Sequence, residues 1–548
     1  MNRTLGVCCY LTSVVLLLVS GGQVFAQGPS DAVYGEPTAL WEWFEKEDPR
    51  EAQDYIQLHP PGPFSYSVIS APGYHVLSDE KIVLIIVNTS LRSSIQSNLD
   101  VYESDLVAFG YDVAIVEAEG GTQQDLKALI EGYYADWGAS LNGCVLIGEL
   151  PIPWFRHIND WDGNPAEFPC DLYYADMDGT WGDADGNGIP DSHTDGSGDT
   201  MPEMWIGRVT AHDMSEDETT LVNSFFEKNH LYRECNAPLP RRALLYQDDD
   251  WATLSGWYNA FGALLGDRDW IQNTETTNAS DYDTRFDDEY QWMLVCAHSN
   301  PGLHAFRTSS GNTYYYVADV MAQNPYFNFC ITFACSNANY SYSDYMSGWY
   351  LFAGDYTQLV LGSTKTGGFY YGTTMFAELE SHQNIGDSYK EWFCEMHPYS
   401  DGEIAWFYGL TLLGDPTLYV PSDTYIDLVS FEAKPLPTEV ELSWETASEV
   451  ENAGFVLFRS RDRDGSDAIQ VSPGMIPSDG TLTAGAHYVY KDLETERGVK
   501  YYYWLIDVDT DGRWTTHGPA SARVTSFSSG LRGTAADHNG LSVWTLGQ

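Results

Sequence analysis

Two apolar runs, Gln291-Trp-Met-Leu-Val-Cys-Ala-His298 and Asn328-Phe-Cys-Ile-Thr-Phe-Ala-Cys335, decide the fold predicted for this chain. Each run is continuous, apolar and too short for a helix, which is typical of a strand buried on both faces of a parallel sheet. The carboxyl ends of such strands open into the crevice where α/β proteins bind ligands. The predicted fold class is therefore α/β, with His298 and Cys335 at one edge of a mainly parallel sheet.

A histidine and a cysteine at the same sheet edge supply the base and the thiol that nucleophilic acyl transfer requires. A nearby imidazole lowers the pKa of a thiol and later protonates the leaving amine. The segment between His298 and Cys335 leaves room for one crossover helix between adjacent strands. Spacing alone leaves a second interpretation open, in which His298 is a satisfied core histidine and Cys335 an inert buried thiol.

The same strand and helix periodicity extends to both sides of these runs. The first set has strands at 82–87, 111–116 and 144–147 and helices at 94–109 and 123–137. The second set has strands at 242–246, 292–297, 327–334 and 357–362 and helices at 254–265 and 314–322. Alternating strands and helices indicate parallel sheets with right-handed crossovers. We therefore predict two successive sets of parallel strands and helices, within residues 81–235 and 236–422.

The N-terminal residues are predicted to lie outside this domain. Residues 1–26 combine Arg3, an apolar run from Leu11 to Val19 and small residues before Ala26, which is the pattern of a cleaved secretory signal. A retained membrane anchor is the alternative. Residues 27–80 are rich in Pro, Trp and acidic residues and are interpreted as a leader or propeptide-like segment. The expected location is secreted or at the cell surface.

The C-terminal residues change character near Pro421. Strands of alternating polarity within 423–526 are separated by Asp-Gly turns, a pattern that predicts an antiparallel β-sandwich. Its aromatic residues are interpreted as core and cross-strand pairs, while carbohydrate binding stays open. Residues 527–548 are rich in Ser and Gly and are predicted to be a flexible tail.

Charge and cysteine content exclude some classes of function. The formal net charge is −52, from 27 basic and 79 acidic residues. Nucleic-acid binding requires a basic surface, so a nucleic-acid partner is not expected. An acidic surface suits a protein that must stay soluble in saline or calcium-containing surroundings, and a saline habitat explains the charge as well as a specific role does. Of the nine cysteines, Cys8 and Cys9 lie in the predicted signal, so an odd number remains and at least one thiol stays unpaired if the others form disulfides.

An acidic insert at 160–199 carries oxygen ligands at alternating positions. These ligands are Asp183, Asp185, Asn187 and Asp191. The spacing resembles a calcium loop, but the twelfth position is Thr194 instead of a bidentate Glu. A dockerin- or thrombospondin-like loop that adds Asp195, or Asp176 and Asp178, fits better than a complete EF-hand. We predict a structural calcium ion and no organic cofactor; a flexible acidic turn is the alternative.

An apolar strand with His, followed by an apolar strand with Ala-Cys, resembles the caspase–legumain–gingipain clan (clan CD) of cysteine peptidases. Further segments resemble the gingipain family: Val145-Leu-Ile-Gly-Glu149, Cys170-Asp-Leu-Tyr-Tyr174, Glu203-Met-Trp-Ile-Gly-Arg208 and Leu412-Leu-Gly-Asp-Pro-Thr-Leu418. They occur in the family's order and span about residues 81–420. The resemblance implies a caspase-like three-layer domain of two subdomains, residues 81–235 and 236–422, with the catalytic pair in the second. The sandwich resembles fibronectin type III-like modules.

The resemblance also implies roles for individual residues. Cys335 would be the nucleophile and His298 the proton carrier, with the backbone amides of Ser299 and Cys335 as oxyanion donors. Asp171 would orient His298 or select a basic side chain in the substrate pocket, and Glu149 is the other candidate to orient the histidine. For both acids, a surface or metal-binding carboxylate is the alternative.

One residue departs from the family pattern. The family usually has Gly directly after the catalytic His, and this chain has Ser299. Serine keeps the amide donor if the backbone conformation is open to a residue with a Cβ. Its hydroxyl could also compete for the histidine. We therefore predict a secreted cysteine endopeptidase acting on protein or peptide substrates. The alternative is a catalytically impaired surface or adhesion protein, whose β-sandwich contacts the cell surface or extracellular matrix.

Overall fold

The computed structural model describes residues 51–71, 81–160, 163–233, 239–248, 250–367, 371–381, 383–420, 426–449, 452–463, 465, 467–480, 485–509 and 514–524. The predicted signal (1–26), the first part of the predicted leader (27–50) and the predicted tail (527–548) lie outside the described residues. Among those described, no helix is both long and apolar enough to cross a membrane.

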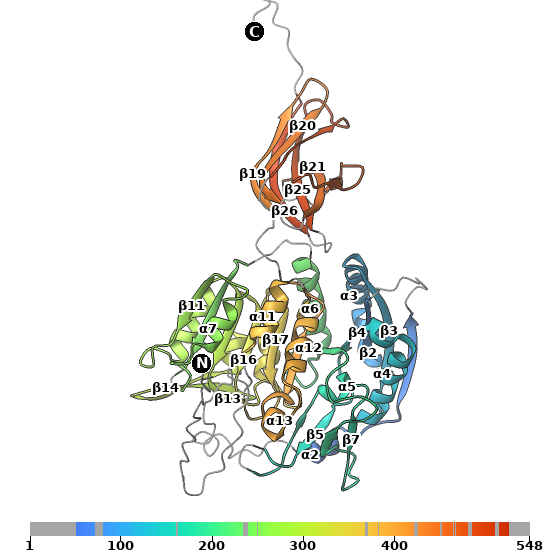
Figure 1. The fold of residues 1–548 in the computed structure, drawn as a ribbon, viewed down its shortest axis with the longest axis vertical. Coiled ribbons are helices and arrows are strands. Elements are labelled where there is room, and N and C mark those ends of the chain that lie inside the picture. The colour runs from blue at the N-terminus through green and yellow to red at the C-terminus, as the bar shows by residue number, and fades with distance from the viewer. Residues whose placement is uncertain are drawn as a thin grey trace, which may run out of the picture.

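An eleven-stranded sheet forms the centre of the molecule (Figure 1). Its first half contains β1 (Ser65–Ser70), β3 (Tyr111–Glu119), β2 (Lys81–Asn88), β4 (Leu141–Ile147) and β9 (Trp205–Val209). Its second half contains β18 (Leu410–Gly414), β17 (Leu359–Ser363), β16 (Phe327–Phe333), β12 (Tyr290–Cys296), β10 (Arg242–Gln247) and β11 (Asp267–Ile271). The α/β prediction is thus confirmed, and one sheet runs through both predicted subdomains.

Most neighbouring strands pair in parallel, as predicted. Parallel pairing runs from β3 to β9 and from β17 to β11. Strand β18 joins the two halves, because it pairs with β9 on one side and, antiparallel, with β17 on the other. The edge strand β1 is antiparallel to β3.

Helices cover both faces of the sheet and complete the three layers. One face carries α3 (Thr89–Ala108), α6 (Glu218–Arg233), α8 (Ala279–Thr284), α9 (Val317–Met321) and α10 (Met346–Phe352). The other carries α4 (Gln123–Trp137), α5 (Leu172–Ala175), α7 (Gly256–Phe261), α11 (Thr373–Glu380), α12 (Ile385–Glu395) and α13 (Asp401–Phe407). Successive residues of β12 alternate between these two cores, Trp292 into one and Met293 into the other. Burial on both faces is why the run is continuously apolar.

Two expected helices differ from the observed elements. The helix expected at 254–265 is shortened to α7. The helix expected at 314–322 begins as a strand, β15 (Gly311–Tyr316), before α9. Strand β15 pairs with β14 (Leu303–Thr308), which pairs with the short β13 (His298–Asn300). The Tyr-rich residues favour a strand once this hairpin supplies a partner, and local periodicity does not reveal that partner.

Residues 51–71, predicted as part of a leader, pack onto the first half of the sheet. Helix α2 (Ala52–Leu58) buries Ala52 and Tyr55 in the core of that half. Strand β1 lengthens the sheet by pairing with β3. This segment is therefore an integral part of the folded domain.

The C-terminal strands form two facing sheets around a separate core. One sheet contains β19 (Ile426–Pro435), β20 (Val440–Glu449) and β24 (His487–Asp492). The other contains β21 (Asn452–Ser460), β22 (Ile469–Gln470), β23 (Ile476–Pro477), β25 (Lys500–Asp509) and β26 (Trp514–Arg523). Their shared core includes Trp444, Phe455 and Tyr503. The predicted β-sandwich is present, and it stands at one end of the α/β domain (Figure 1).

Candidate active site

Strand register places His298 and Cys335 next to each other. Strands β12 and β16 are parallel, with Cys296 opposite Phe333. The amide of Ala297 donates to the carbonyl of Phe333 at 3.3 Å, which continues the ladder beyond the last pair. His298 and Cys335 follow at the same distance along their strands. Because neighbouring strands lie about 4.8 Å apart, the two backbone positions are adjacent at the sheet edge.

A carboxylate from a third strand end contacts the histidine. Asp250 follows β10, the neighbour of β12, and its Oδ2 lies 2.5 Å from Nε2 of His298. Arg307 Nη1 donates to the same oxygen at 3.0 Å. The hydrogen bond from His298 lowers the pKa of the Asp250 carboxyl, and Arg307 adds to this effect. An ionised carboxylate in this position holds the ring and stabilises its protonated form.

The histidine is buried against an aromatic side chain. The His298 residue is 3% exposed, and the ring of Trp251 packs against it with centroids 4.6 Å apart. Trp251 comes from the loop that carries Asp250, so one loop both packs and hydrogen-bonds the imidazole. Cys335 is half-buried, which leaves the thiol side of the pair partly open.

The residue after the cysteine forms a sharp turn. Ser336 has a φ of 51°, in the left-handed region that non-glycine residues seldom adopt. Its amide donates to the carbonyl of Lys365 at 2.8 Å, which fixes the turn to the loop after β17. The Ser336 amide already donates a hydrogen bond within the protein, so it is not a candidate oxyanion donor. The backbone amides of Ser299 and Cys335 stay the predicted donors.

Ser299 occupies an extended position whose hydroxyl is already bonded. It lies in β13 opposite His304, and the positive φ values among described non-glycine residues occur elsewhere. The hydroxyl donates to the carbonyl of Asn300 at 3.0 Å and accepts from Nδ2 of Asn337 at 3.0 Å. The backbone here therefore accommodates a Cβ, and the hydroxyl is directed to Asn300 and Asn337.

A buried ion pair lies beneath the cysteine loop. Lys365 Nζ lies 2.8 Å from Oδ1 of Asp160, and both side chains are almost fully buried. Burial raises the pKa of Asp160, but Lys365 and His157 outweigh it and hold the pKa below its ordinary value. The pair connects the end of β5 (Trp154–His157) to the loop that supports Ser336.

Asp171 lies in a different polar cluster from His298. Its Oδ1 accepts from Arg208 Nε at 2.8 Å and from the Tyr340 hydroxyl at 3.1 Å, and its Oδ2 accepts from Thr411 at 2.6 Å. Both carboxylate oxygens accept hydrogen bonds, and the buried guanidinium of Arg208 balances the negative charge of Asp171. In the structure Asp171 thus ties the loop after Cys335 to the first half of the sheet, and Asp250 takes the position beside His298.

Glu149 is also remote from His298. It follows β4, which is five positions from β12 in the strand order, a separation on the order of 20 Å at the usual strand spacing. Its carboxylate lies beside His59 and His212 instead. The sequence motif correctly marks a strand end, but the sheet order separates that end from the cysteine and histidine.

The predicted calcium ligands lie in a tight loop of the acidic insert. Asp183 accepts from the amides of Gly186, Asn187 and Gly188, and Asp185 accepts from the amide of Asn187. Asp191 accepts from the amide of Ala184 across the loop. Beside it, Asp176, Asp178 and Glu203 bring three carboxylate oxygens within 4.8 Å of one another. This second group contains two of the alternative ligands named from the sequence.

A family model described as Peptidase family C25 matches residues 77–421. The chain belongs to this family. It is a cysteine peptidase-like protein, and the matched range covers the whole α/β sheet except β1. No curated protein sequence matches this C25 family member.

Solved structures resemble this C25 family member at low identity. The Arg-specific cysteine proteinase gingipain R (RgpB) is 14% identical to this chain, with a TM-score of 0.48. The match covers 83% of this chain and 100% of the gingipain chain. A complex of Porphyromonas gingivalis RgpB pro- and mature domains is 14% identical, with a TM-score of 0.45, and the match covers 79% of this chain and 98% of the matched chain. An Fn3-like protein from Clostridium thermocellum is 18% identical, with a TM-score of 0.13, and the match covers 17% of this chain and 84% of the matched chain.

Sequence reasoning on this C25 chain missed Asp250. The signal was available, because Asp248-Asp-Asp250 follows directly after the buried strand β10. The adjacency of β10 and β12 makes the last of these acids the partner of His298.

Proposed function

We propose that this protein is a secreted cysteine endopeptidase that hydrolyses peptide bonds through Cys335 and His298. The observation that carries the proposal is the register of β12 and β16, which makes the backbone positions of the two residues neighbours, together with the contact of Asp250 to the imidazole. Membership of family C25 supports peptide bonds as the bonds cleaved.

The proposed reaction has two stages. The thiolate of Cys335 attacks the scissile carbonyl carbon, and the backbone amides of Ser299 and Cys335 stabilise the oxyanion. The C–N bond breaks as the His298 imidazolium donates its proton to the leaving amine, which leaves a thioester. His298 then takes a proton from water, which attacks the thioester and releases the acid and the thiol. Asp250 stabilises the imidazolium throughout.

Substitution of the nucleophile tests the proposal. Cys335→Ala is expected to abolish cleavage of a protein substrate, while the matched control Cys394→Ala, at another half-buried cysteine, retains it. An iodoacetamide-type probe is expected to label Cys335 quickly and saturably, and to lose this reaction in His298→Ala. Cleavage at the parental rate by Cys335→Ala would reject the proposal.

The second candidate is a catalytically impaired adhesion protein on the same fold, with the β-sandwich as the contact to a cell surface or matrix. Ser299 and the separate sandwich motivate it. The extended backbone at Ser299 and the bonds of its hydroxyl favour the enzyme instead. Labelling of Cys335 at the rate of an ordinary exposed thiol, unchanged in His298→Ala, would favour the adhesion protein.

Calcium binding by the acidic insert is part of the proposal. The carboxylates of Asp176, Asp178 and Glu203 bring three oxygens within 4.8 Å of one another, and oxygen donors of this kind suit Ca²⁺. Asp183, Asp185, Asn187 and Asp191 form the adjoining loop. Chelation is expected to lower the melting temperature and added Ca²⁺ to restore it; a melting temperature insensitive to chelator would reject a structural calcium ion.

Secretion is proposed from residues 1–26. Expression of the full chain in a secreting host is expected to release a protein that begins at Gln27 or later, because cleavage is predicted after Ala26. N-terminal sequencing of the released protein checks this. Retention of Met1 on a membrane-bound chain would support the alternative of an anchor.

A further inference from the structure

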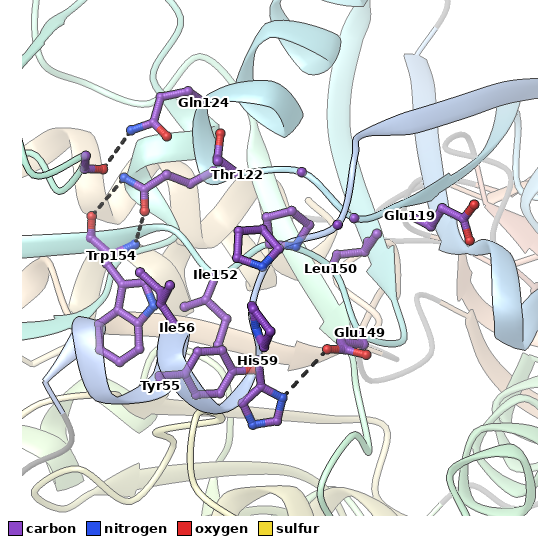
Figure 2. A pocket seen from close by; sticks show the side chains of 18 of the residues that line it. Tyr55, Ile56, His59, Glu119, Thr122, Gln124, Glu149, Leu150, Ile152 and Trp154 are labelled. Atoms are coloured by element: carbon purple, nitrogen blue, oxygen red, sulfur yellow. Dashed lines mark hydrogen bonds and ion pairs between the residues drawn. The ribbon is translucent and has the colours of Figure 1, made fainter.

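A pocket of about 580 Å³ lies in the first half of the sheet, and its lining residues do not include His298 or Cys335. Figure 2 shows this pocket from close by. It lies where β2, β3 and β4 end, and α2 and the segment after it form one wall. Tyr55 from this wall and Ile152 and Trp154 from the segment after β4 give the pocket an apolar surface, and Glu149 and His59 lie together at its rim (Figure 2).

Three metal-binding side chains from separate segments meet at this rim. His59 follows α2, Glu149 follows β4 and His212 follows β9. Each offers one ligand atom, and these atoms all lie within 4.8 Å of one another. Glu149 Oε1 is 3.4 Å from His212 Nε2 and 3.9 Å from His59 Nδ1. Zinc bonds of 2.0–2.1 Å in a tetrahedron place ligand atoms about 3.3 Å apart, so small shifts would close the site.

A neighbouring carboxylate holds one of the imidazoles. Asp213 Oδ2 lies 3.2 Å from Nε2 of His59, on the opposite side of the ring from the nitrogen that faces Glu149. Metal-bound histidines usually donate their second ring nitrogen to a carboxylate in this manner. Asp213 adopts a left-handed φ of 62°, an uncommon backbone conformation at the residue that makes this contact.

The second histidine has a buried nitrogen that the described residues do not satisfy. Nε2 of His212 is shielded from solvent and has no hydrogen-bond partner among them, although Glu149 and Asp213 oxygens lie 3.4 and 3.6 Å away. Oε1 of the nearby Glu218 is likewise buried without a hydrogen bond in the described part of the chain. A buried polar atom without a partner is destabilising, and a cation bound at this rim would satisfy Nε2 of His212.

Negative charge surrounds the histidines. Within the described residues, the ion-pair partners of Glu149 and Asp213 are His59 and His212. Glu218 interacts electrostatically with His212, Glu149 and Asp213. Carboxylates gathered around two imidazoles favour a cation between them.

We propose that His59, Glu149 and His212 bind one divalent transition-metal ion, with Asp213 as the residue that orients His59. Two imidazoles and one carboxylate suit Zn²⁺ and similar ions, whereas Ca²⁺ and Mg²⁺ prefer oxygen ligands throughout. A fourth position is left for water from the pocket. Since His59 belongs to the N-terminal segment and the other ligands to the sheet edge, the ion fixes residues 51–62 against the domain.

Zinc binding to the full chain tests this site. All proteins carry Cys335→Ala, because the thiol is itself a zinc ligand, and all are stripped with chelator and supplied with excess Ca²⁺. The parent is expected to bind one equivalent of Zn²⁺ that His59→Gln, His212→Gln and Glu149→Gln each lose. Asp213→Asn is expected to weaken the affinity roughly 10- to 100-fold. His487→Gln, at an exposed residue of β24, is the matched control and is expected to retain the zinc.

Amide hydrogen exchange shows whether the ion fixes the N-terminal segment. Zinc is expected to slow exchange in residues 51–62 of the parent and to leave it unchanged in His59→Gln. His59 is a half-buried residue at a helix end, so this variant is expected to fold, and parental exchange in β12 and β16 verifies that it has. Absence of stoichiometric zinc in the parent, or its retention by folded His59→Gln, would overturn the site. Neither result depends on peptidase activity.

Discussion

At the scale of single residues, the contact with Asp250 shapes the acid–base environment of His298. Nε2 is held by Asp250, and in the proposed mechanism Nδ1 exchanges the proton with the thiol. The pKa of Asp250 is lowered chiefly by the hydrogen bond from His298. The carboxylate therefore stays charged over the neutral pH range and favours the protonated imidazole.

Asp250→Asn is expected to reduce kcat/KM by on the order of 100-fold, because the amide cannot stabilise the imidazolium. Loss of the charge lowers the pKa of the imidazolium, so the alkaline limb of the pH–rate profile should move to lower pH. Steady-state kinetics across pH check both effects, with exposed Asp288→Asn as the control. A reduced rate with an unmoved profile would leave Asp250 with a structural role alone.

Ser299→Gly tests whether the departure from the family pattern limits the reaction. The backbone at this position is extended, so glycine is not required there, and kcat/KM is expected to change less than about threefold. The variant should be less stable by about 1 kcal/mol, because the unfolded chain gains freedom and Asn337 loses a hydrogen-bond acceptor. Kinetics and thermal melting check this. A rate gain of more than tenfold would show that serine impairs the oxyanion site.

At the scale of elements, two buried strands and their loops build the site. The residues of β12 and β16 are all buried, and the parallel register fixes the relative positions of the residues that follow. Ser336 then turns the chain sharply and is anchored to Lys365. The cysteine is therefore presented from a fixed turn and not from a free loop.

The acidic insert and the adjoining Glu203 form a unit whose stability should depend on pH. Burial raises the pKa of Glu203 to about 7, and Asp176 and Asp178 add to this effect. The folded protein thus binds a proton that the unfolded chain, with an ordinary pKa of about 4.3, has already released. In chelator, this contribution to stability is present below about pH 4 and is lost as pH rises through 7.

Glu203→Gln removes this titration and should flatten the corresponding part of the pH dependence. At pH 8 in chelator, its melting temperature is expected to exceed that of the parent by on the order of 1–3 °C. With calcium present the order should reverse, since the amide is a weaker ligand for the ion. Melting curves from pH 4.5 to 8 check this, and an unchanged pH dependence in the variant would contradict it.

At the scale of the whole molecule, separate hydrophobic cores divide the chain. The two cores of the α/β domain lie on opposite faces of one sheet, and the sandwich has a third core of its own. In that third core Trp444 is 1% exposed, stacks on Tyr488 at 5.0 Å and meets Phe455 edge-on at 5.4 Å.

Trp444→Ala is expected to destabilise the sandwich by about 3–5 kcal/mol, because it removes the largest side chain of that core. Hydrolysis of a peptide substrate should stay at the parental rate, since Cys335, His298 and Asp250 all lie in the other domain. Calorimetry should show one transition lowered and the other unchanged. A parallel loss of activity would mean that the two domains depend on each other.

The sequence by itself determined the α/β class, the strands that end in His298 and Cys335, helices such as α4, and the β-sandwich. These features follow from the spacing of apolar residues along short stretches of chain, and that spacing can be read from the sequence alone. Only the tertiary structure decided that Asp250 contacts His298 and that Arg208 donates a hydrogen bond to Asp171. It also decided that the Glu149 carboxylate lies beside His59 and His212. Such partners are remote in sequence, and the order of strands in the sheet decides which of the many carboxylates reaches which cation.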